Sequence, residues 1–358
     1  MSMAAKLAAW AHRIWQTRNP ISYLLYPASL ITAAIVRRKR ARYQSQQELA
    51  YRSPCPVIVV GNIVVGGTGK TPVVIAICHY LQSQGWTPGI ISRGYGVHID
   101  PLQPRHAQHH AHAQDIGDEP ALLTQATGAP ICVHPKRALA ARSLLEHYPE
   151  VNVIIADDGM QHLALARDIQ IAVQDQRGVG NGWLLPAGPL RDQAQRLQEV
   201  DWLITQLGTN TPLPHTPRPP DALRNIVMRL HPMRVRQLHG TLSFSWPQWL
   251  LHSQGKRIAA LAAIGQPQRF FHMLQTAGVT LQQTRALADH AVITQHSFAG
   301  LETDYILLTA KDAVKYTAGH DPRLYIVEVD AEFSHANWLH DLNQSVQFHH
   351  QRLLGSGL

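Results

Sequence analysis

Apolar and polar positions form blocks along most of the chain, with short β-branched runs separated by longer helical stretches. A helix is predicted for TPVVIAICHYLQSQG, where Pro72 lies near the start and Gly85 follows the end. Continuous apolar runs with helices between them predict a mostly parallel sheet that is covered on both faces, which is a doubly wound α/β fold. The runs typical of strands are PVIVVG (56–61), TPGIISRG (87–94), VNVIIAD (151–157), DIQIAVQD (168–175) and DWLITQ (201–206).

The second half of the chain repeats this pattern on a smaller scale. Residues 207–223 are rich in proline and threonine, which predicts a linker or an exposed crossing. Residues 225–246 have the pattern of a pair of strands. Further strand-like runs with helices between them are RIAALAAIG (257–265), YILLTAKDA (305–313) and LYIVEVD (324–330). We therefore predict a second, smaller α/β domain.

The N-terminal region carries an apolar stretch, ISYLLYPASLITAAIV (21–36), that is shorter than the about 20 residues of a straight membrane span and contains Pro27. The basic run RRKRAR (37–42) follows it, and Trp10, Arg13, Trp15 and Arg18 precede it. Flanking cations and aromatic rings favour a helix that lies in an anionic leaflet, where each Lys or Arg adds about 1 kcal/mol of binding free energy. The alternatives are a cleaved signal peptide and an ordinary core helix.

Composition narrows the class of protein and of partner. With 45% hydrophobic and 16% charged residues the chain is globular, which excludes intrinsic disorder. A formal charge of +8 indicates an anionic partner, which could be nucleic acid, a membrane surface or a phosphorylated substrate. The strongest basic run is fused to the apolar stretch, so we predict a membrane surface and no nucleic acid. The scattered cysteines, which are Cys55, Cys78 and Cys132, indicate neither a disulfide framework nor a zinc site, and fit a reducing cytoplasm.

The segment GNIVVGGTGKTP (61–72) predicts a phosphate loop between a buried strand and a helix. Gly69, Lys70 and Thr71 match the end of G-x-x-x-x-G-K-[ST], whereas Val64 replaces the first glycine. We expect Lys70 to contact the β- and γ-phosphates and the Thr71 hydroxyl to bind Mg²⁺. The predicted nucleotide-binding residues are Gly66, Gly67, Thr68, Gly69, Lys70 and Thr71.

Acidic residues supply the second part of the predicted site. Asp157 and Asp158 follow the apolar run 151–156, so they emerge at the carboxyl edge of the sheet, where we expect them to bind Mg²⁺ or its waters. A plain Asp-Gly turn is the alternative. Asp118 and Glu119 of GDEP precede a helix, where acids commonly complement the helix dipole. The histidine tract RHAQHHAHAQ (105–114) has the pattern of a polar loop rather than a metal site.

Together these motifs resemble the tetraacyldisaccharide 4'-kinases of lipid A biosynthesis, over most of the chain. Val64 matches the same departure from the standard loop in that family. The segments that carry the resemblance are GNIVVGGTGKTP (61–72), ISRGYG (91–96), GDEP (117–120), DDGMQH (157–162), GNGWLLPAGPLRD (180–192), AAIGQPQRFF (262–271), ADH (288–290) and LTAKDAVK (308–315).

The resemblance implies transfer of the ATP γ-phosphate to the 4'-hydroxyl of an acylated glucosamine disaccharide 1-phosphate, which forms lipid IVA. It also implies that Asp118 is the catalytic base, paired with His290, and that Lys70 acts in catalysis. Asp192 stands where the family has Glu, and Ala310 where it has another Glu. We retain Asp192 as a candidate metal ligand beside Thr71, Asp157 and Asp158.

The implied organisation is a P-loop NTPase-type α/β enzyme on the cytoplasmic side of the inner membrane, attached peripherally or monotopically. The alternative is a membrane-associated P-loop nucleotide switch or ATPase without an organic acceptor. The predicted divisions are an N-terminal membrane-surface helical segment (1–50), a P-loop kinase core (51–215), a β-rich linker (216–255) and a smaller C-terminal α/β domain (256–358).

Overall fold

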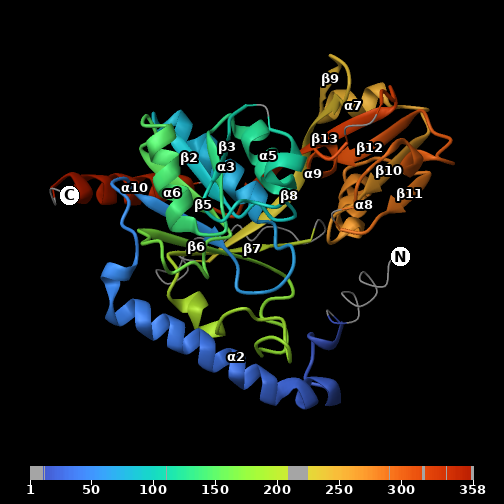
Figure 1. The fold of residues 1–358 in the computed structure, drawn as a ribbon. Helices are drawn as coiled ribbons and strands as arrows, with labels where there is room; N and C mark the ends of the chain where they lie inside the picture. The colour runs from blue at the N-terminus through green and yellow to red at the C-terminus, as the bar shows by residue number, and fades with distance from the viewer. Residues whose placement is uncertain are drawn as a thin grey trace.

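The computed structural model describes residues 11, 13–109, 111–208, 225–289, 291–316, 319–335 and 337–355. The strands in these residues form one 13-stranded sheet in the order β11-β10-β12-β13-β8-β7-β6-β1-β5-β2-β4-β3, with β9 paired to β8. Figure 1 shows a large lobe, built on β1 to β7, and a small lobe, built on β9 to β12, with β8 and β13 running between them.

The strands predicted from the apolar runs are confirmed, and nearly all neighbours in the large lobe pair in parallel. The exception there is β3, an antiparallel edge strand. The strands of the large lobe are β1 (Val57–Gly61), β2 (Pro88–Ser92), β3 (Arg105–Ala107), β4 (Ile131–Val133), β5 (Val153–Asp157), β6 (Ile169–Asp175) and β7 (Trp202–Gln206).

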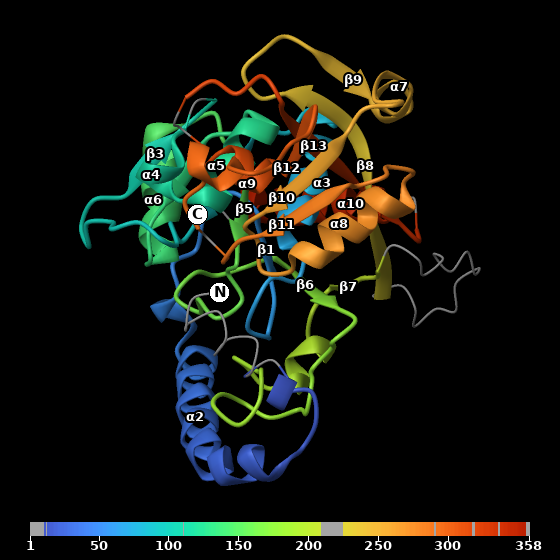
Figure 2. The same cartoon turned by 90° about the vertical axis from the view of Figure 1, so that its right-hand side faces the viewer.

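Helices cover both faces of this sheet, as the doubly wound prediction requires. Along β1, Ile58 and Val60 enter the core that α3 and α5 cover, whereas Val57 and Val59 enter the core that α6 covers. In Figure 2 the small lobe faces the viewer, and α4, α5 and α6 lie to one side of it. The helices of this lobe are α3 (Lys70–Ser83), α4 (Ala113–Ile116), α5 (Asp118–Thr127) and α6 (Arg137–His147).

A long antiparallel ribbon joins the lobes. Strand β8 (Asn225–Gln237) pairs with β7 at its start and with β13 (Leu324–Phe333) over most of its length. The predicted strand pair at 225–246 is confirmed, because β9 (Ser243–Ser245) lies antiparallel to the end of β8. The small lobe adds β10 (Ile258–Ala262), β11 (Gln283–Ala286) and β12 (Tyr305–Thr309), with α7 (Trp246–His252), α8 (Pro267–Thr276) and α9 (Ala310–Ala313).

Helix α10 (Trp338–Gly355) leaves the small lobe and packs against the large one. Trp338, Leu342 and Val346 are buried in the same core as α3. The Trp86 indole also donates a 2.8 Å hydrogen bond to the Asn343 side chain. The division of the chain into domains stays a prediction, and this helix, which the prediction assigned to the smaller domain, lies with the larger lobe.

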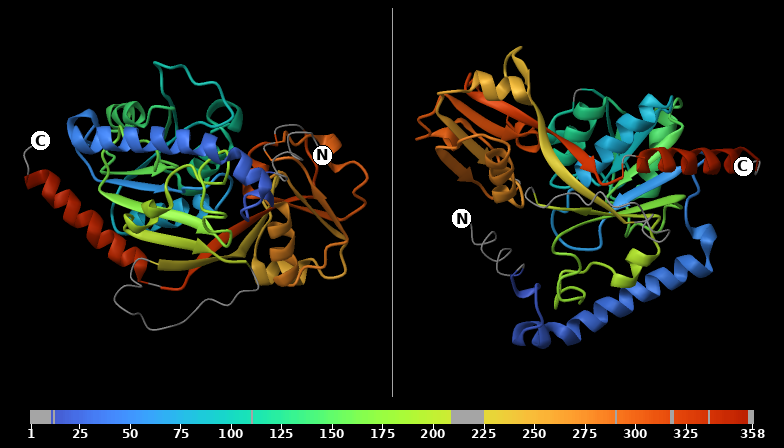
Figure 3. Two further views of the ribbon diagram at one scale, coloured as in Figure 1. Left: turned by 90° about the horizontal axis from the view of Figure 1, so that it is seen from below. Right: turned by 180° about the vertical axis from the view of Figure 1, so that it is seen from behind.

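Helix α2 (Pro20–Ser45) lies along the lower side of the large lobe (Figure 3). The Asn19 side chain caps it by accepting a hydrogen bond from the Ser22 amide, and the helix continues through the basic run. By length and composition alone it is long and apolar enough to cross a membrane. Ser22 and Ser29 are buried against the protein, whereas Leu24, Ile31 and Ile35 are 80%, 64% and 63% exposed.

We expect Trp338→Ala to destabilise the protein by about 3–5 kcal/mol, because it removes a large side chain that is only 1% exposed in the shared core. Phe348→Ala, on the same helix but 62% exposed, serves as the control and should change the free energy of unfolding much less. Urea unfolding measures both. Equal losses in the two variants would show that α10 does not pack into the large-lobe core.

Candidate active site

The predicted phosphate loop lies at the carboxyl end of β1 and leads into α3. Gly66 and Gly69 have φ angles of +99° and +85°, a left-handed conformation that favours glycine. The buried Asn62 side chain donates hydrogen bonds to the Gly66 carbonyl at 3.2 Å and to the Thr68 hydroxyl at 3.1 Å. Gly67 is exposed and Lys70 begins the helix. The loop therefore presents its backbone at a helix N-terminus, as phosphate binding requires.

Val64, the departure from the standard loop, has a packing role. It is buried and forms an antiparallel bridge with Leu190. The neighbouring Val65 amide donates a 2.9 Å hydrogen bond to the Pro189 carbonyl, and the Arg191 amide donates one of 2.7 Å to the Ile63 carbonyl. The first half of the loop is thus held by the segment 177–192 rather than by a glycine turn.

The same segment also contacts the N-terminal helix. Trp183 packs edge-on against Tyr23 with ring centroids 5.0 Å apart, and at 4.5 Å from Tyr26. The Arg18 guanidinium lies over the Trp183 ring at 5.1 Å. The Asn181 amide donates a 2.9 Å hydrogen bond to the Trp15 carbonyl. Segment 177–192 therefore connects α2 to the phosphate loop.

The two predicted acids at the end of β5 have different surroundings. Arg191 forms two hydrogen bonds of 2.9 and 3.0 Å with the Asp158 carboxylate, and the Lys70 amine lies 3.6 Å from it. Burial alone would raise the pKa of Asp158, but Lys70 and Arg191 hold it far below the usual range. Asp157 is buried and accepts a 2.9 Å hydrogen bond from the Ser92 hydroxyl. Burial, with the Glu119 carboxylate adding to it, raises the pKa of Asp157 to about 6.

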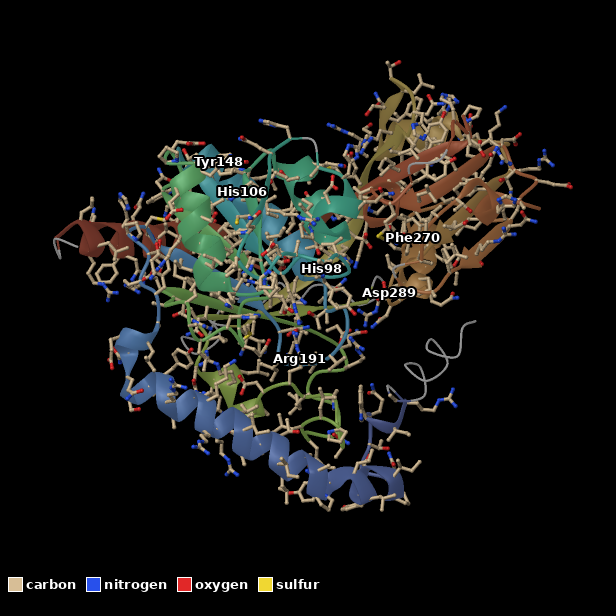
Figure 4. All side chains as sticks on the ribbon, viewed as in Figure 1. His98, His106, Tyr148, Arg191, Phe270 and Asp289 are labelled. Carbon is tan, nitrogen blue, oxygen red and sulfur yellow. The ribbon has the colours of Figure 1, made fainter. Side chains whose placement is uncertain are left out.

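Asp118 and Glu119 begin α5 after Gly117, whose φ is +94° and where a Cβ would lie 2.7 Å from the Tyr95 carbonyl oxygen. Glu119 forms a 2.8 Å ion pair with Lys311 of the small lobe. Burial alone would lower the pKa of Lys311, but Glu119 raises it, and Asp289 and Asp118 act in the same direction. Acids from both lobes therefore surround this lysine. Figure 4 labels Asp289 on the side of the small lobe that faces the large lobe.

A second contact between the lobes centres on Asp175, at the end of β6. Its fully buried carboxylate accepts hydrogen bonds from the Arg177 amide and guanidinium, and one of 3.0 Å from Arg269 of the small lobe. Arg177 also donates a 3.0 Å hydrogen bond to the Gly67 carbonyl. Burial would raise the pKa of Asp175, but Arg177 and Arg269 lower it. This carboxylate links the phosphate loop to the small lobe.

Most of the predicted site residues lie together at the carboxyl edge of the sheet. Lys70, Asp157, Asp158 and Glu119 are electrostatic neighbours there. The Asp192 carboxylate instead accepts a hydrogen bond from the Gln193 amide and acts on Arg167, so its role as a metal ligand stays a prediction. His290, the predicted partner of Asp118, falls outside the described residues.

The donor set fits Mg²⁺. Thr71, the second residue of α3, carries a hydroxyl oxygen. The Asp157 carboxylate, whose pKa is raised by burial and by Glu119, is a second oxygen donor, and a cation would stabilise its charged form. No group of three His, Cys, Asp or Glu side chains able to cage a metal occurs within the described residues. Magnesium commonly binds through one or two carboxylates together with substrate phosphates, so a complete protein cage is not required.

Several contacts of the site do not follow from the sequence alone. Arg191 lies inside a motif that carried the resemblance, yet nothing local indicates that it binds Asp158; Figure 4 labels it beneath the sheet. Lys311 lies within LTAKDAVK, and its pairing with Glu119 joins residues 192 positions apart, so neither motif alone indicates it. An unassigned cation within a motif that already holds acids is the signal that could have found both.

A phosphate loop at the carboxyl edge of a doubly wound sheet, beside acids that suit a cation, defines a P-loop NTPase-type enzyme. A family model for tetraacyldisaccharide-1-P 4'-kinase matches residues 21–347, and the chain belongs to this family.

Similar proteins agree with this assignment. The tetraacyldisaccharide 4'-kinase of Bordetella petrii is 48% identical, covering 93% of this chain and 94% of that protein. The one from Vibrio cholerae (strain O395) is 40% identical, with 90% and 92% covered. A crystal structure of LpxK from Aquifex aeolicus in complex with ATP has a TM-score of 0.73 at 21% identity, covering 91% of this chain and 98% of that one. That structure confirms the predicted fold.

We expect His162 to make the protein less stable in mild acid. Burial, with Arg137 and Lys39 adding to it, lowers the His162 pKa from 6.5 to about 4 in the folded protein. The unfolded chain therefore binds a proton that the folded chain does not, and stability falls as the pH drops below 6.5. Between pH 6.5 and 5 the loss should reach about 2 kcal/mol.

Urea unfolding across this pH range tests the effect in His162→Gln, where the stability profile should be flatter by that amount. His272→Gln, which changes an exposed histidine, should keep the slope of the unaltered protein. Parallel profiles for all three proteins would contradict the assignment to His162.

Proposed function

We propose that this enzyme transfers the γ-phosphate of ATP to the 4'-hydroxyl of an acylated glucosamine disaccharide 1-phosphate and so forms lipid IVA in lipid A biosynthesis. The observation that carries the proposal is the position of Lys70, at the start of α3, 3.6 Å from Asp158 and close enough to Asp157 and Glu119 to favour the charged form of each. Phosphoryl transfer depends mainly on positioning and on charge neutralisation, and this arrangement supports both.

The ATP phosphates would lie on the backbone amides of residues 66–71, with Lys70 neutralising charge on the transferred group. Asp158 already has a bidentate partner in Arg191, so Lys70 can leave it for the phosphates without isolating a carboxylate. Arg177, which holds the Gly67 carbonyl, would fix the loop during the reaction.

Mg²⁺ would be held by Thr71 and by Asp157 or Asp158. When bound, the ion would neutralise negative charge on the ATP phosphates. Asp157 is positioned for this role by Ser92, which donates to one carboxylate oxygen. The Asp192 carboxylate, one methylene shorter than the Glu that the resemblance implies, is retained as a further candidate ligand.

Asp118 is the proposed base that accepts the proton of the sugar hydroxyl, with His290 as its proposed partner. Its place at the first position of α5, next to Glu119, supports this role because Glu119 joins the small lobe through Lys311. The acceptor would enter between the lobes, where Asp289 precedes His290 and interacts with Lys311.

The acceptor is proposed to stay in the bilayer at the cytoplasmic face of the inner membrane, since each buried CH₂ contributes about 0.8 kcal/mol. Helix α2 supports this proposal with an outward face that carries exposed Leu24, Ile31 and Ile35, followed by the basic residues 37–42. Docking of this face would bring the catalytic edge to the lipid.

Lys70→Ala and Asp118→Ala should each reduce phosphate transfer by at least about 100-fold, through loss of charge neutralisation and of the base. The assay incubates the protein with ATP, Mg²⁺ and the acylated disaccharide in detergent and follows a lipid product one phosphate heavier. Lys136→Ala and Asp115→Ala, which change exposed residues, are the matched controls and should retain activity. ATP hydrolysis that ignores the lipid, with no phosphorylated product, would favour the switch or ATPase alternative.

Replacing Ile31 and Ile35 together by Glu should release the protein from anionic vesicles, because two exposed apolar side chains would become charged in the interface. Sedimentation with vesicles measures the bound fraction, which should fall at least about tenfold. Leu251→Glu, an equally exposed apolar position on α7, should bind like the unaltered protein. Unchanged binding of the α2 variant would move the docking surface elsewhere.

A further inference from the structure

A cavity of about 310 Å³ lies at the C-terminal end of α2, and its lining contains four arginines. Arg40 comes from α2, Arg52 precedes β1, Arg167 lies just before β6, and Arg196 belongs to the 3₁₀ helix Ala194–Gln198. The remaining lining includes Tyr43, Gln44, Gln47 and the aliphatic residues Leu163, Leu165 and Ala166. Because it adjoins the start of β6, it lies toward the edge of the sheet opposite the phosphate loop.

The carboxylates in contact with these arginines do not match them in number. Arg40 and Arg196 share one acid, Glu199, at 2.7 and 2.6 Å. Arg52 contacts Asp168 at 2.7 Å, but the Asp168 carboxylate also lies 3.6 Å from both His349 and Arg352 of α10. The carboxylates of Glu199 and Asp168 therefore pair with three of the cavity's arginines, and Asp168 also lies near two cationic side chains of α10.

Arg167 has no ion-pair contact among the described residues. Its guanidinium donates hydrogen bonds to the backbone carbonyls of Met160, His162 and Leu165, which are neutral groups and do not balance its charge. Asp192 acts on it from farther away. Burial, followed by the positive charge of Arg196, lowers the pKa of Arg167 to about 10. The two guanidinium groups repel each other, and an anion between them would relieve the repulsion.

We propose that this cavity binds the phosphodiester headgroup of an anionic phospholipid, and we refer to it as the headgroup site. Guanidinium groups suit phosphate oxygens, and Tyr43 with the leucines would pack against the glycerol portion. Its volume is near the lower limit of small-molecule pockets, which fits a headgroup better than a nucleotide. The proposal rests on the membrane docking of α2 described above, because that places the end of the helix at the level of lipid phosphates.

Titration calorimetry of the full chain with dihexanoylphosphatidylglycerol, below its micelle concentration, tests the headgroup site without a membrane. We expect saturable binding of one molecule per chain, and at least about tenfold weaker binding of dihexanoylphosphatidylcholine, whose choline the arginines repel. Inorganic phosphate forms the third arm. Equal affinity for inorganic phosphate would overturn the lipid assignment, and so would the absence of saturable binding.

Variants with opposite expected effects separate recognition from a structural role. Arg40→Gln should weaken binding of the soluble lipid about tenfold, whereas Glu199→Gln should strengthen it because it removes a competing carboxylate. Arg38→Gln, an exposed cation of the same helix outside the lining, should change binding less than about twofold. Equal losses in Arg38→Gln and Arg40→Gln would indicate diffuse attraction and overturn the proposal.

The test of the headgroup site can be separated from the test of the proposed kinase reaction. Arg52→Gln, which changes another arginine of the lining, should also weaken binding of the soluble lipid about tenfold. Its kinase activity in a detergent that contains no phospholipid should equal that of the unaltered protein, since Arg52 contacts Asp168, toward the edge of the sheet opposite the phosphate loop. A protein that binds the soluble lipid but transfers no phosphate would refute the kinase proposal and leave the headgroup site standing. A protein that transfers phosphate but does not bind the soluble lipid would refute the headgroup site and leave the kinase proposal standing.

Discussion

The ion pair between Arg191 and Asp158 is the contact on which the candidate active site, at the carboxyl edge of the sheet, depends. Adjacent carboxylates at the end of a buried strand repel each other, and their charge must be balanced by nearby cations. Arg191 balances Asp158 through two hydrogen bonds, and its own amide and the Pro189 carbonyl hold the phosphate loop at Ile63 and Val65. One segment thereby sets the loop conformation and the charge beside Lys70.

Charged contacts join the two lobes at this edge, beside Val314 of the small lobe, which packs on the large-lobe core. Glu119 with Lys311 and Asp175 with Arg269 each pair an acid of the large lobe with a cation of the small lobe. Both acids lie next to functional residues, since Glu119 follows the proposed base and Asp175 reaches the phosphate loop through Arg177. The position of the small lobe is therefore coupled to the electrostatics of the site. The antiparallel ribbon of β8 and β13 supplies the covalent and hydrogen-bonded connection.

Apolar runs predicted most of the inner strands because those strands are buried on both faces. The inner strand β4 was not predicted, because its apolar run of three residues is too short to stand out. Strand β11 (Gln283–Ala286) is a mostly exposed edge strand with no apolar pattern, so periodicity could not reveal it. Helix α2 extends to Ser45 because Arg and Lys are good helix formers, although the apolar block ends at Val36. The phosphate loop and Asp158 followed from motif and position. The cations that pair with the acids of the site could not be predicted, because they come close to those acids only in the folded protein. Lys311, for example, lies 192 positions along the chain from Glu119.

The contacts of Trp183 limit where the chain can be truncated and which substitutions it can accept. Its ring is enclosed by Arg18, Tyr23 and Tyr26, and its segment supports the phosphate loop. The N-terminal helix is therefore also part of the scaffold of the nucleotide site. Cutting the chain before the P-loop core to obtain a soluble fragment would strip this tryptophan of its aromatic partners. Helix α2 and the phosphate loop therefore form one structural unit, and each constrains the sequence changes that the other can accept.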